Sequence, residues 1–108
     1  CLSRGLGDVY KRQDGSCERG ILLCGTGIGM AITANKIPGI RAAVGHDLFS
    51  VERSIKSNHC QVLCMGARVI APQYAKLLAE RWLECDFAGG ASAEKVARIM
   101  EIEQEYRG

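Results

Sequence analysis

The chain has 108 residues, which is enough for one small domain with a modest hydrophobic core. Hydrophobic residues make up 47% and charged residues 24%, values that are typical of globular proteins and argue against wholesale disorder. The formal net charge is +2, without a basic run, which argues against a nucleic-acid partner. The apolar runs are far shorter than the ~20 residues of a membrane span, so no membrane partner is expected.

The first 13 residues show neither helical nor strand periodicity, and they begin with Cys1 and not with methionine. They resemble a translated sequencing adapter, so we predict that residues 1–13 are a non-native leader and that residues 14–108 belong to the domain. A genuine disordered leader is the alternative. No charged-then-apolar segment suggests export, and we therefore expect a cytoplasmic location.

From Gly20 onward, apolar runs alternate with helical patterns. Buried strands are predicted at 20–24, 40–45 and 61–65, and helices at 29–36, 50–56 and 72–85. Pro72 suits a first helical turn, and Ser92 is predicted to cap a last helix that ends near residue 104. This alternation favours the α/β class, with a parallel sheet between two layers of helices.

The six cysteines are expected to be reduced, because nothing in the sequence indicates export. No Cys-x-x-Cys pair occurs, and Cys60 and Cys64 with His59 nearby form a poor zinc pattern. Cys64 lies in an apolar run and Cys60 just before it, so both are predicted to be buried small hydrophobic residues. No metal and no cofactor is expected.

The most informative segment follows the first predicted strand. Cys24 ends that strand, and glycines follow at positions 25, 27 and 29. Glycines at this spacing let the backbone turn sharply and leave its N–H groups facing an anion at a helix N-terminus. The partial positive charge there favours a thiolate on Cys24. A thiolate beside an oxyanion cradle is suited to proton abstraction next to a carbonyl.

Several motifs together resemble one family, the type B ribose-5-phosphate isomerases and galactose-6-phosphate isomerases, over roughly residues 14–104. The matching segments are Cys24-Gly25-Thr26-Gly27-Ile28-Gly29-Met30, Ala34-Asn35-Lys36, Gly39-Ile40-Arg41-Ala42-Ala43, Asn58, Val62-Leu63, Gly66-Ala67-Arg68-Val69-Ile70 and Lys95-Val96. The resemblance implies a three-layer α/β/α Rossmann-like fold, here without the family's first two strands and the Asp-His pair that contacts the sugar. With the family strand order 2-1-3-4-5, the strand at 20–24 would be an exposed apolar edge. It also implies a homodimer or a dimer of dimers.

The resemblance further implies aldose–ketose isomerisation of a small sugar phosphate through a cis-enediolate. Cys24 matches the family's cysteine base, and Met30 places the chain in the cysteine branch, since some relatives have a glutamate there. The other implied site residues are Thr26 as a polar contact in catalysis, Gly25, Gly27 and Gly29 as the oxyanion cradle, Arg68 for the phosphate, Lys95 in place of a partner subunit's arginine, and Asn58 for the sugar's hydroxyl end.

Some positions depart from the pentose enzymes. Ser57 stands where they have a ring-opening histidine, and Ala91 and Ser92 replace an Arg-His pair that helps hold the pentose phosphate. His59 lies two residues after the position of that histidine and is not expected to replace it. His46 is expected to be a strand-end residue without a catalytic role. A tetrose phosphate such as erythrulose 4-phosphate needs no ring opening, so these departures favour it over ribose 5-phosphate, which remains the alternative.

Two other function classes stay open from the residues alone. A nucleotide-binding module could use the glycine turn with Asp47 as a ribose-binding acid, although Met30 stands where the third glycine of that motif belongs. A structural, thiol-rich domain is the third reading.

Overall fold

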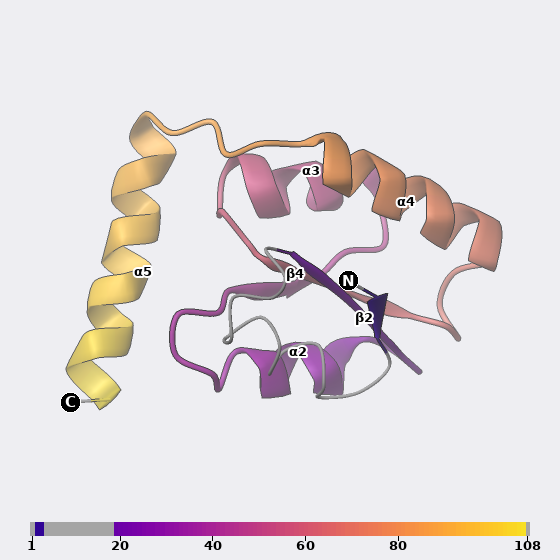
Figure 1. Ribbon diagram of the computed structural model, residues 1–108, viewed down its shortest axis with the longest axis horizontal. Helices are drawn as coiled ribbons and strands as arrows, with labels where there is room; N and C mark the ends of the chain where they lie inside the picture. The colour runs from indigo at the N-terminus through magenta and orange to yellow at the C-terminus, as the bar shows by residue number, and fades with distance from the viewer. Residues whose placement is uncertain (1, 4–18, 108) are drawn as a thin grey trace.

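The structure is a computed structural model that describes residues 2–3 and 19–107. Figure 1 shows a sheet with helices on both faces and a last helix set apart from it. In chain order the elements are β1 (Leu2–Ser3), β2 (Gly20–Cys24), α2 (Ile28–Ala34), β3 (Ala42–Val44), α3 (Leu48–Lys56), β4 (Val62–Gly66), α4 (Pro72–Glu84) and α5 (Ala91–Arg107). The α/β class and the Rossmann-like architecture predicted from the sequence are confirmed.

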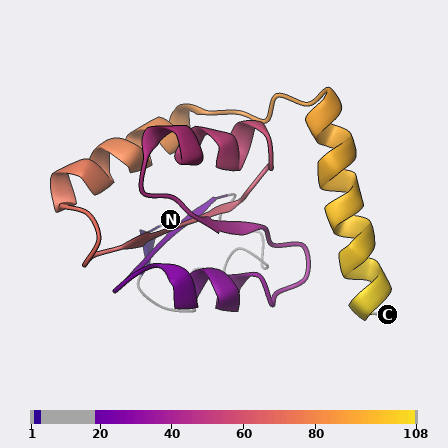
Figure 2. The ribbon, with the colours of Figure 1, turned by 180° about the vertical axis from the view of Figure 1, so that it is seen from behind.

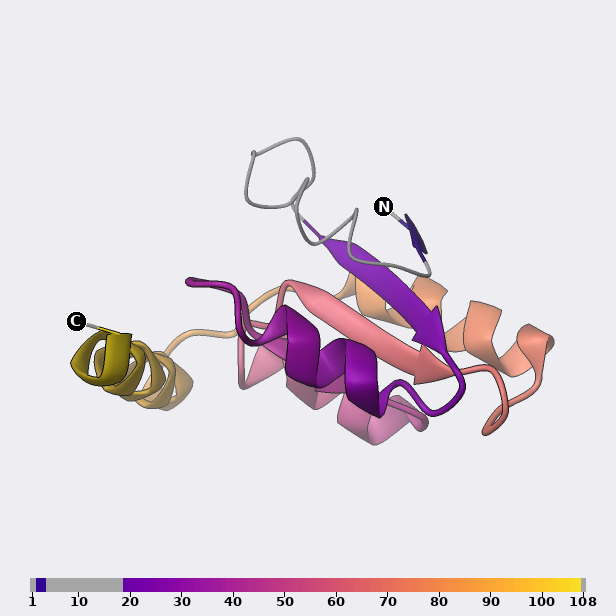
Figure 3. The same ribbon diagram turned by 90° about the horizontal axis from the view of Figure 1, so that it is seen from below.

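The four strands in the described part of the chain form one parallel sheet in the order β1-β2-β4-β3. The family strand order predicted that β3 would lie between β2 and β4. This prediction is wrong, because β4 lies between β2 and β3. Every residue of β4 is buried, as expected for the central strand of a sheet that is covered on both faces. Figure 3 shows β2 and β4 side by side with their carboxyl ends at the same edge.

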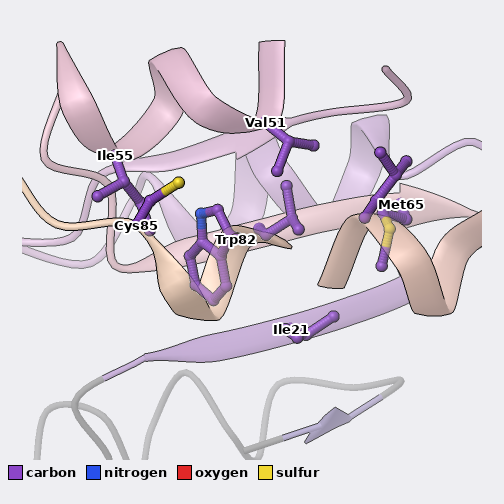
Figure 4. Close-up of a cluster of buried hydrophobic side chains, with 8 residues drawn as sticks. Ile21, Val51, Ile55, Met65, Trp82 and Cys85 are labelled. Atoms are coloured by element: carbon purple, nitrogen blue, oxygen red, sulfur yellow. The ribbon is translucent and has the colours of Figure 1, made fainter. Parts of the chain in front are cut away.

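Alternate residues of the strands supply two hydrophobic cores. Ile21, Leu63 and Met65 pack with α3 and α4 around Trp82, which is fully buried (Figure 4). Leu22, Val62 and Cys64 pack with Ala31 and Ala34 of α2 in the second core. Figure 1 shows α2 on the face of the sheet opposite α3 and α4. The two cores fix the sheet between its helices and hold the carboxyl ends of the strands in place.

Of the predicted leader, residues 1–13, the structure describes only Leu2 and Ser3. These two residues pair with Ile21 and Leu22, so the edge of β2 that was expected to be exposed is covered at these positions, although residues 1–13 show no strand periodicity. The rest of the expected leader lies outside the described residues, and its origin stays a prediction. At the other end, α5 begins at Ala91, so Ser92 lies inside the helix and does not cap it.

Helix α5 lies beyond the amino-terminal ends of β2 and β4, as Figures 2 and 3 show. It is tied to the segment between α2 and β3. The Arg107 guanidinium donates to the carbonyl oxygens of Lys36 and Asn35 at 2.6 and 3.1 Å, and the Glu103 carboxylate accepts from the Gly39 N–H at 3.1 Å. Among the described residues, no helix is long and apolar enough to cross a membrane.

Candidate functional site at the carboxyl edge of the sheet

Cys24 ends β2 and is the first residue of a tight turn that leads into α2. The Gly27 N–H donates to its Sγ at 3.1 Å, and the thiol is half-buried. Thr26 is exposed in the same turn, and its Oγ1 accepts from the Ile28 N–H at 3.3 Å. The turn therefore carries a thiol and a hydroxyl, two residues apart in the chain, at the carboxyl edge of the sheet.

Two glycines allow this turn to form. Gly27 has φ +84°, a left-handed conformation that favours glycine, and a Cβ there would lie 3.1 Å from the backbone of Met65. At the end of β4, a Cβ on Gly66 would lie 2.6 Å from the Cα of Thr26. The turn thus packs backbone to backbone against the end of β4, and a side chain at Gly66 would push the two apart.

The loop after β4 is clamped to the same turn. Cys24 O accepts from the Ala67 N–H at 2.7 Å, and Gly25 O accepts from the Arg68 N–H at 3.0 Å. The Arg68 side chain passes over Gly25, where a Cβ would meet Arg68 Cδ at 3.7 Å. Arg68 is exposed, and its guanidinium forms no ion pair with any residue that the structure describes. A free guanidinium at this edge can bind an anion.

The first turn of α2 leaves further donors at this edge. The helix's own hydrogen bonds begin with the Ala31 N–H, which donates to Gly27 O at 3.1 Å. Within the described ranges, the N–H groups of Gly29 and Met30 have no acceptor, as is usual at a helix N-terminus. These donors, together with Cys24, Thr26 and Arg68, are the predicted site residues that the structure brings together.

Asn58 and Lys95 are not part of this group within one chain. Asn58 follows α3, its amide donates to Arg53 O at 2.9 Å, and it lines a groove of about 480 Å³ with residues of β3 and α5. Lys95 is exposed near the start of α5. The end of α3 and the whole of α5 lie on the amino-terminal side of the sheet, opposite the carboxyl ends of β2 and β4 (Figure 1). Asn58, which follows α3, and Lys95, which lies in α5, are therefore on that side.

The residues that depart from the pentose enzymes lie on that same far side. Ser57 ends α3, and its hydroxyl accepts from the Arg53 guanidinium at 2.8 Å. His59 stacks on Phe87, with ring centroids 4.5 Å apart.

Asp47, which the nucleotide-binding alternative takes as a ribose-binding acid, caps the start of α3. Its carboxylate accepts from the Ser50 N–H at 2.8 Å. These bonds to Ser50 hold the pKa of the Asp47 carboxyl below its usual value.

The other described cysteines are structural. Cys60, Cys64 and Cys85 are buried free thiols, which confirms the prediction for Cys60 and Cys64. Burial raises the pKa of Cys60 to about 11 and that of Cys64 to about 12, so both stay protonated at neutral pH. No cluster of three or more metal-ligating side chains occurs in the ranges that the structure describes.

One polar contact at this edge was missed from the sequence. His46 follows β3, and its Nε2 accepts from the Gly66 N–H at 2.8 Å. The expectation of a strand-end residue without catalytic role left this contact out. A polar residue directly after a strand whose neighbour carries the site is the sequence signal that could have suggested it.

Comparisons with known proteins identify the family of the chain. The family model described as Ribose/Galactose Isomerase matches residues 9–99. The chain belongs to this family. It is 55% identical over 95 residues to a D-erythrulose-4-phosphate isomerase of Pectobacterium atrosepticum and 58% identical over 90 residues to a ribose-5-P isomerase B of Listeria innocua. These alignments cover 88% and 83% of the chain.

The solved structures place the fold in the same family. The ribose-5-phosphate isomerase B of Clostridium thermocellum superposes with a TM-score of 0.90 at 40% identity, covering 94% of this chain and 68% of that one. The chain spans 62% and 61% of the length of the two curated relatives. The relatives therefore contain segments without a counterpart in this chain.

Proposed function

We propose that the chain supplies the catalytic edge of an aldose–ketose isomerase that acts on a small sugar phosphate. The carrying observation is that Cys24 Sγ, the Thr26 hydroxyl and the Arg68 guanidinium converge at the ends of two paired strands, in a chain of the isomerase family. Base, polar contact and phosphate anchor are the three groups that such a reaction requires.

Cys24 acts as the base in this proposal. The Gly27 N–H that donates to Sγ stabilises negative charge on the sulfur. The thiolate takes the proton from the carbon next to the carbonyl of the open-chain sugar, which leaves a cis-enediolate. The thiol then returns the proton to the neighbouring carbon while the hydroxyl proton passes from one enediolate oxygen to the other, so that carbonyl and hydroxyl exchange places without a net change in oxidation state. A positioned base of this kind contributes about 10²–10⁴-fold.

The developing negative charge on the enediolate oxygens needs donors. The N–H groups of Gly29 and Met30, without acceptors in the described chain, and the exposed Thr26 hydroxyl are in position to serve. Of the other glycines in the predicted cradle, Gly27 already donates its N–H to Cys24 Sγ, and the Gly25 carbonyl oxygen accepts from the Arg68 backbone N–H.

A second copy of the chain completes the site in our proposal, as a homodimer or a dimer of dimers. Asn58 and Lys95 lie on the far side of the sheet, so they can meet a substrate at Cys24 only from another copy. Exposed apolar side chains on α5 support a partner there, because Ile99 and Ile102 are 43% and 42% exposed. Free thiols at the described cysteines are compatible with the cytoplasmic location proposed for such an enzyme.

The substrate we propose is a tetrose phosphate, with erythrulose 4-phosphate as the leading candidate. Ser57, Ala91 and Ser92 lack the groups that open a furanose ring and hold a pentose phosphate. The name of the Pectobacterium relative favours the tetrose phosphate, whereas the name of the Listeria relative favours ribose 5-phosphate as the alternative.

The deciding experiment compares kcat/KM for erythrulose 4-phosphate and for ribose 5-phosphate on the full-length protein. Loss of one charged phosphate contact costs about 1.5–3 kcal/mol, so we expect the tetrose phosphate to be preferred about ten- to a hundredfold. A higher kcat/KM for ribose 5-phosphate would establish the alternative, and turnover of neither would refute the isomerase proposal.

A further inference from the structure

The end of β4 contains a backbone N–H that the sheet does not satisfy. Strand β3 pairs with β4 only as far as Val44 and Cys64, and the Gly45 N–H donates to Cys64 O at 3.1 Å. The chain then leaves the sheet at Gly45, where a Cβ would lie 2.9 Å from Val51 Cγ2. In a longer ladder, the next backbone carbonyl of the β3 chain would accept from Gly66. Because β3 ends earlier here, the Gly66 N–H would be a buried donor without a partner unless another group accepted from it.

His46 supplies the missing acceptor. Its Nε2 lies 2.8 Å from the Gly66 nitrogen. Because a backbone N–H can only donate, this ring nitrogen carries no proton, and the neutral ring keeps its proton on Nδ1. The imidazole therefore takes the place of a strand carbonyl and extends the support of β4 by one residue.

Gly66 lies at the centre of the contacts between the end of β4 and the turn that carries Cys24. The backbone of Thr26 crosses directly over it, at 2.6 Å from the position of a Cβ. The next two residues, Ala67 and Arg68, bind the carbonyl oxygens of Cys24 and Gly25. A shift of Gly66 would thus move Cys24 and Arg68 together.

We propose that His46 is a positioning residue for this site, which holds Gly66 through Nε2 and thereby fixes the turn of Cys24 and the loop of Arg68 at the end of β4. This inference rests on the proposed isomerase function for its catalytic consequence, but its structural part stands on the hydrogen bond alone. His46 touches no reacting atom in this account and is not a catalytic residue.

The test compares two variants of the full-length protein. His46→Phe keeps a planar ring and removes the acceptor, whereas His46→Gln offers a carbonyl oxygen as a replacement acceptor. The first readout is hydrogen exchange of the Gly66 amide by NMR. It should accelerate about tenfold in His46→Phe, the effect of losing one hydrogen bond, and return toward the wild-type rate in His46→Gln.

The second readout is the isomerase assay. For His46→Phe we expect kcat to fall about ten- to a hundredfold, as for a small misplacement of catalytic groups, with partial rescue by His46→Gln. Unchanged Gly66 exchange would overturn the proposal, as would faster exchange with unchanged kcat. If the unaltered protein turns over no sugar phosphate, the proposed function fails, and Gly66 exchange still judges the hydrogen bond.

A measurement without any variant covers the case in which both variants fail to fold. The ¹⁵N resonances of the His46 ring in the unaltered protein report which nitrogen carries the proton. We expect the neutral ring with its proton on Nδ1. A proton on Nε2 at neutral pH would overturn the proposal.

Discussion

The Gly27 N–H donates to Cys24 Sγ at 3.1 Å, and the two residues are three positions apart in the chain. In the same turn Gly27 adopts φ +84°, a left-handed conformation that favours glycine. The sulfur that ends the strand and the glycine that begins the helix are thus coupled through backbone geometry. The same contact would support negative charge on the sulfur during proton transfer.

This relationship predicts that Cys24 is the reactive thiol among the four described cysteines. At pH 7–8, iodoacetamide should modify Cys24 first, because Cys60 and Cys64 are buried and their pKa values are raised to about 11 and about 12. Peptide mass spectrometry after a short pulse measures the order. Urea should make the buried cysteines reactive as the fold is lost. Modification of Cys60 or Cys64 before Cys24 in the native protein would contradict the prediction.

A methyl group at Gly66 should disrupt both fold and site. In Gly66→Ala the new Cβ would meet the backbone of Thr26 at 2.6 Å, so we expect a loss of about 1–3 kcal/mol in the free energy of unfolding, typical of overpacking. Gly20→Ala is the matched control, because a Cβ there meets nothing within 4 Å. Urea unfolding measures both variants. Equal stability of Gly66→Ala and Gly20→Ala would show that the turn and β4 are not packed as described.

Arg68 should govern phosphate affinity. Arg68→Gln removes the charge and the paired donors, and we expect KM for the sugar phosphate to rise about ten- to a hundredfold, with the free energy of unfolding little changed. Arg98→Gln is a suitable control, since Arg98 lies in α5 and pairs with Glu101 and Glu105. Steady-state kinetics, with inorganic phosphate as a competitive inhibitor, separates the two. An unaltered KM and an unaltered phosphate inhibition constant in Arg68→Gln would remove Arg68 from the site.

The sequence predicted the elements of the sheet better than their arrangement. Apolar runs marked β2 and β4, since both are buried on two faces, but strand order depends on how the crossovers pack, which local patterns do not encode. The residues 62–66 are almost uniformly apolar, which fits a central strand. The helix α5 began before Ser92, because a capping residue type does not by itself fix where a helix starts.

The candidate site was also predicted in part from the sequence. Cys24, Thr26 and the glycines are neighbours in sequence, so their motif predicted their proximity, and Arg68 was added by the family resemblance. The contact between His46 and Gly66 joins residues 20 positions apart, and no local pattern announces it. The separation of Asn58 from Cys24 follows from the direction of α3, which carries the chain from one edge of the sheet to the other.

The most direct test of the account follows the proton that Cys24 is proposed to move. The full-length protein and its Cys24→Ala variant are incubated with erythrulose 4-phosphate in D₂O, and deuterium at the carbon next to the carbonyl is measured by NMR. We predict isomerisation with incorporation of solvent deuterium by the unaltered protein, and a rate lower by about 10²–10⁴-fold in Cys24→Ala with the fold retained. Isomerisation and exchange by Cys24→Ala at a near-normal rate would contradict the assignment of Cys24 as the base.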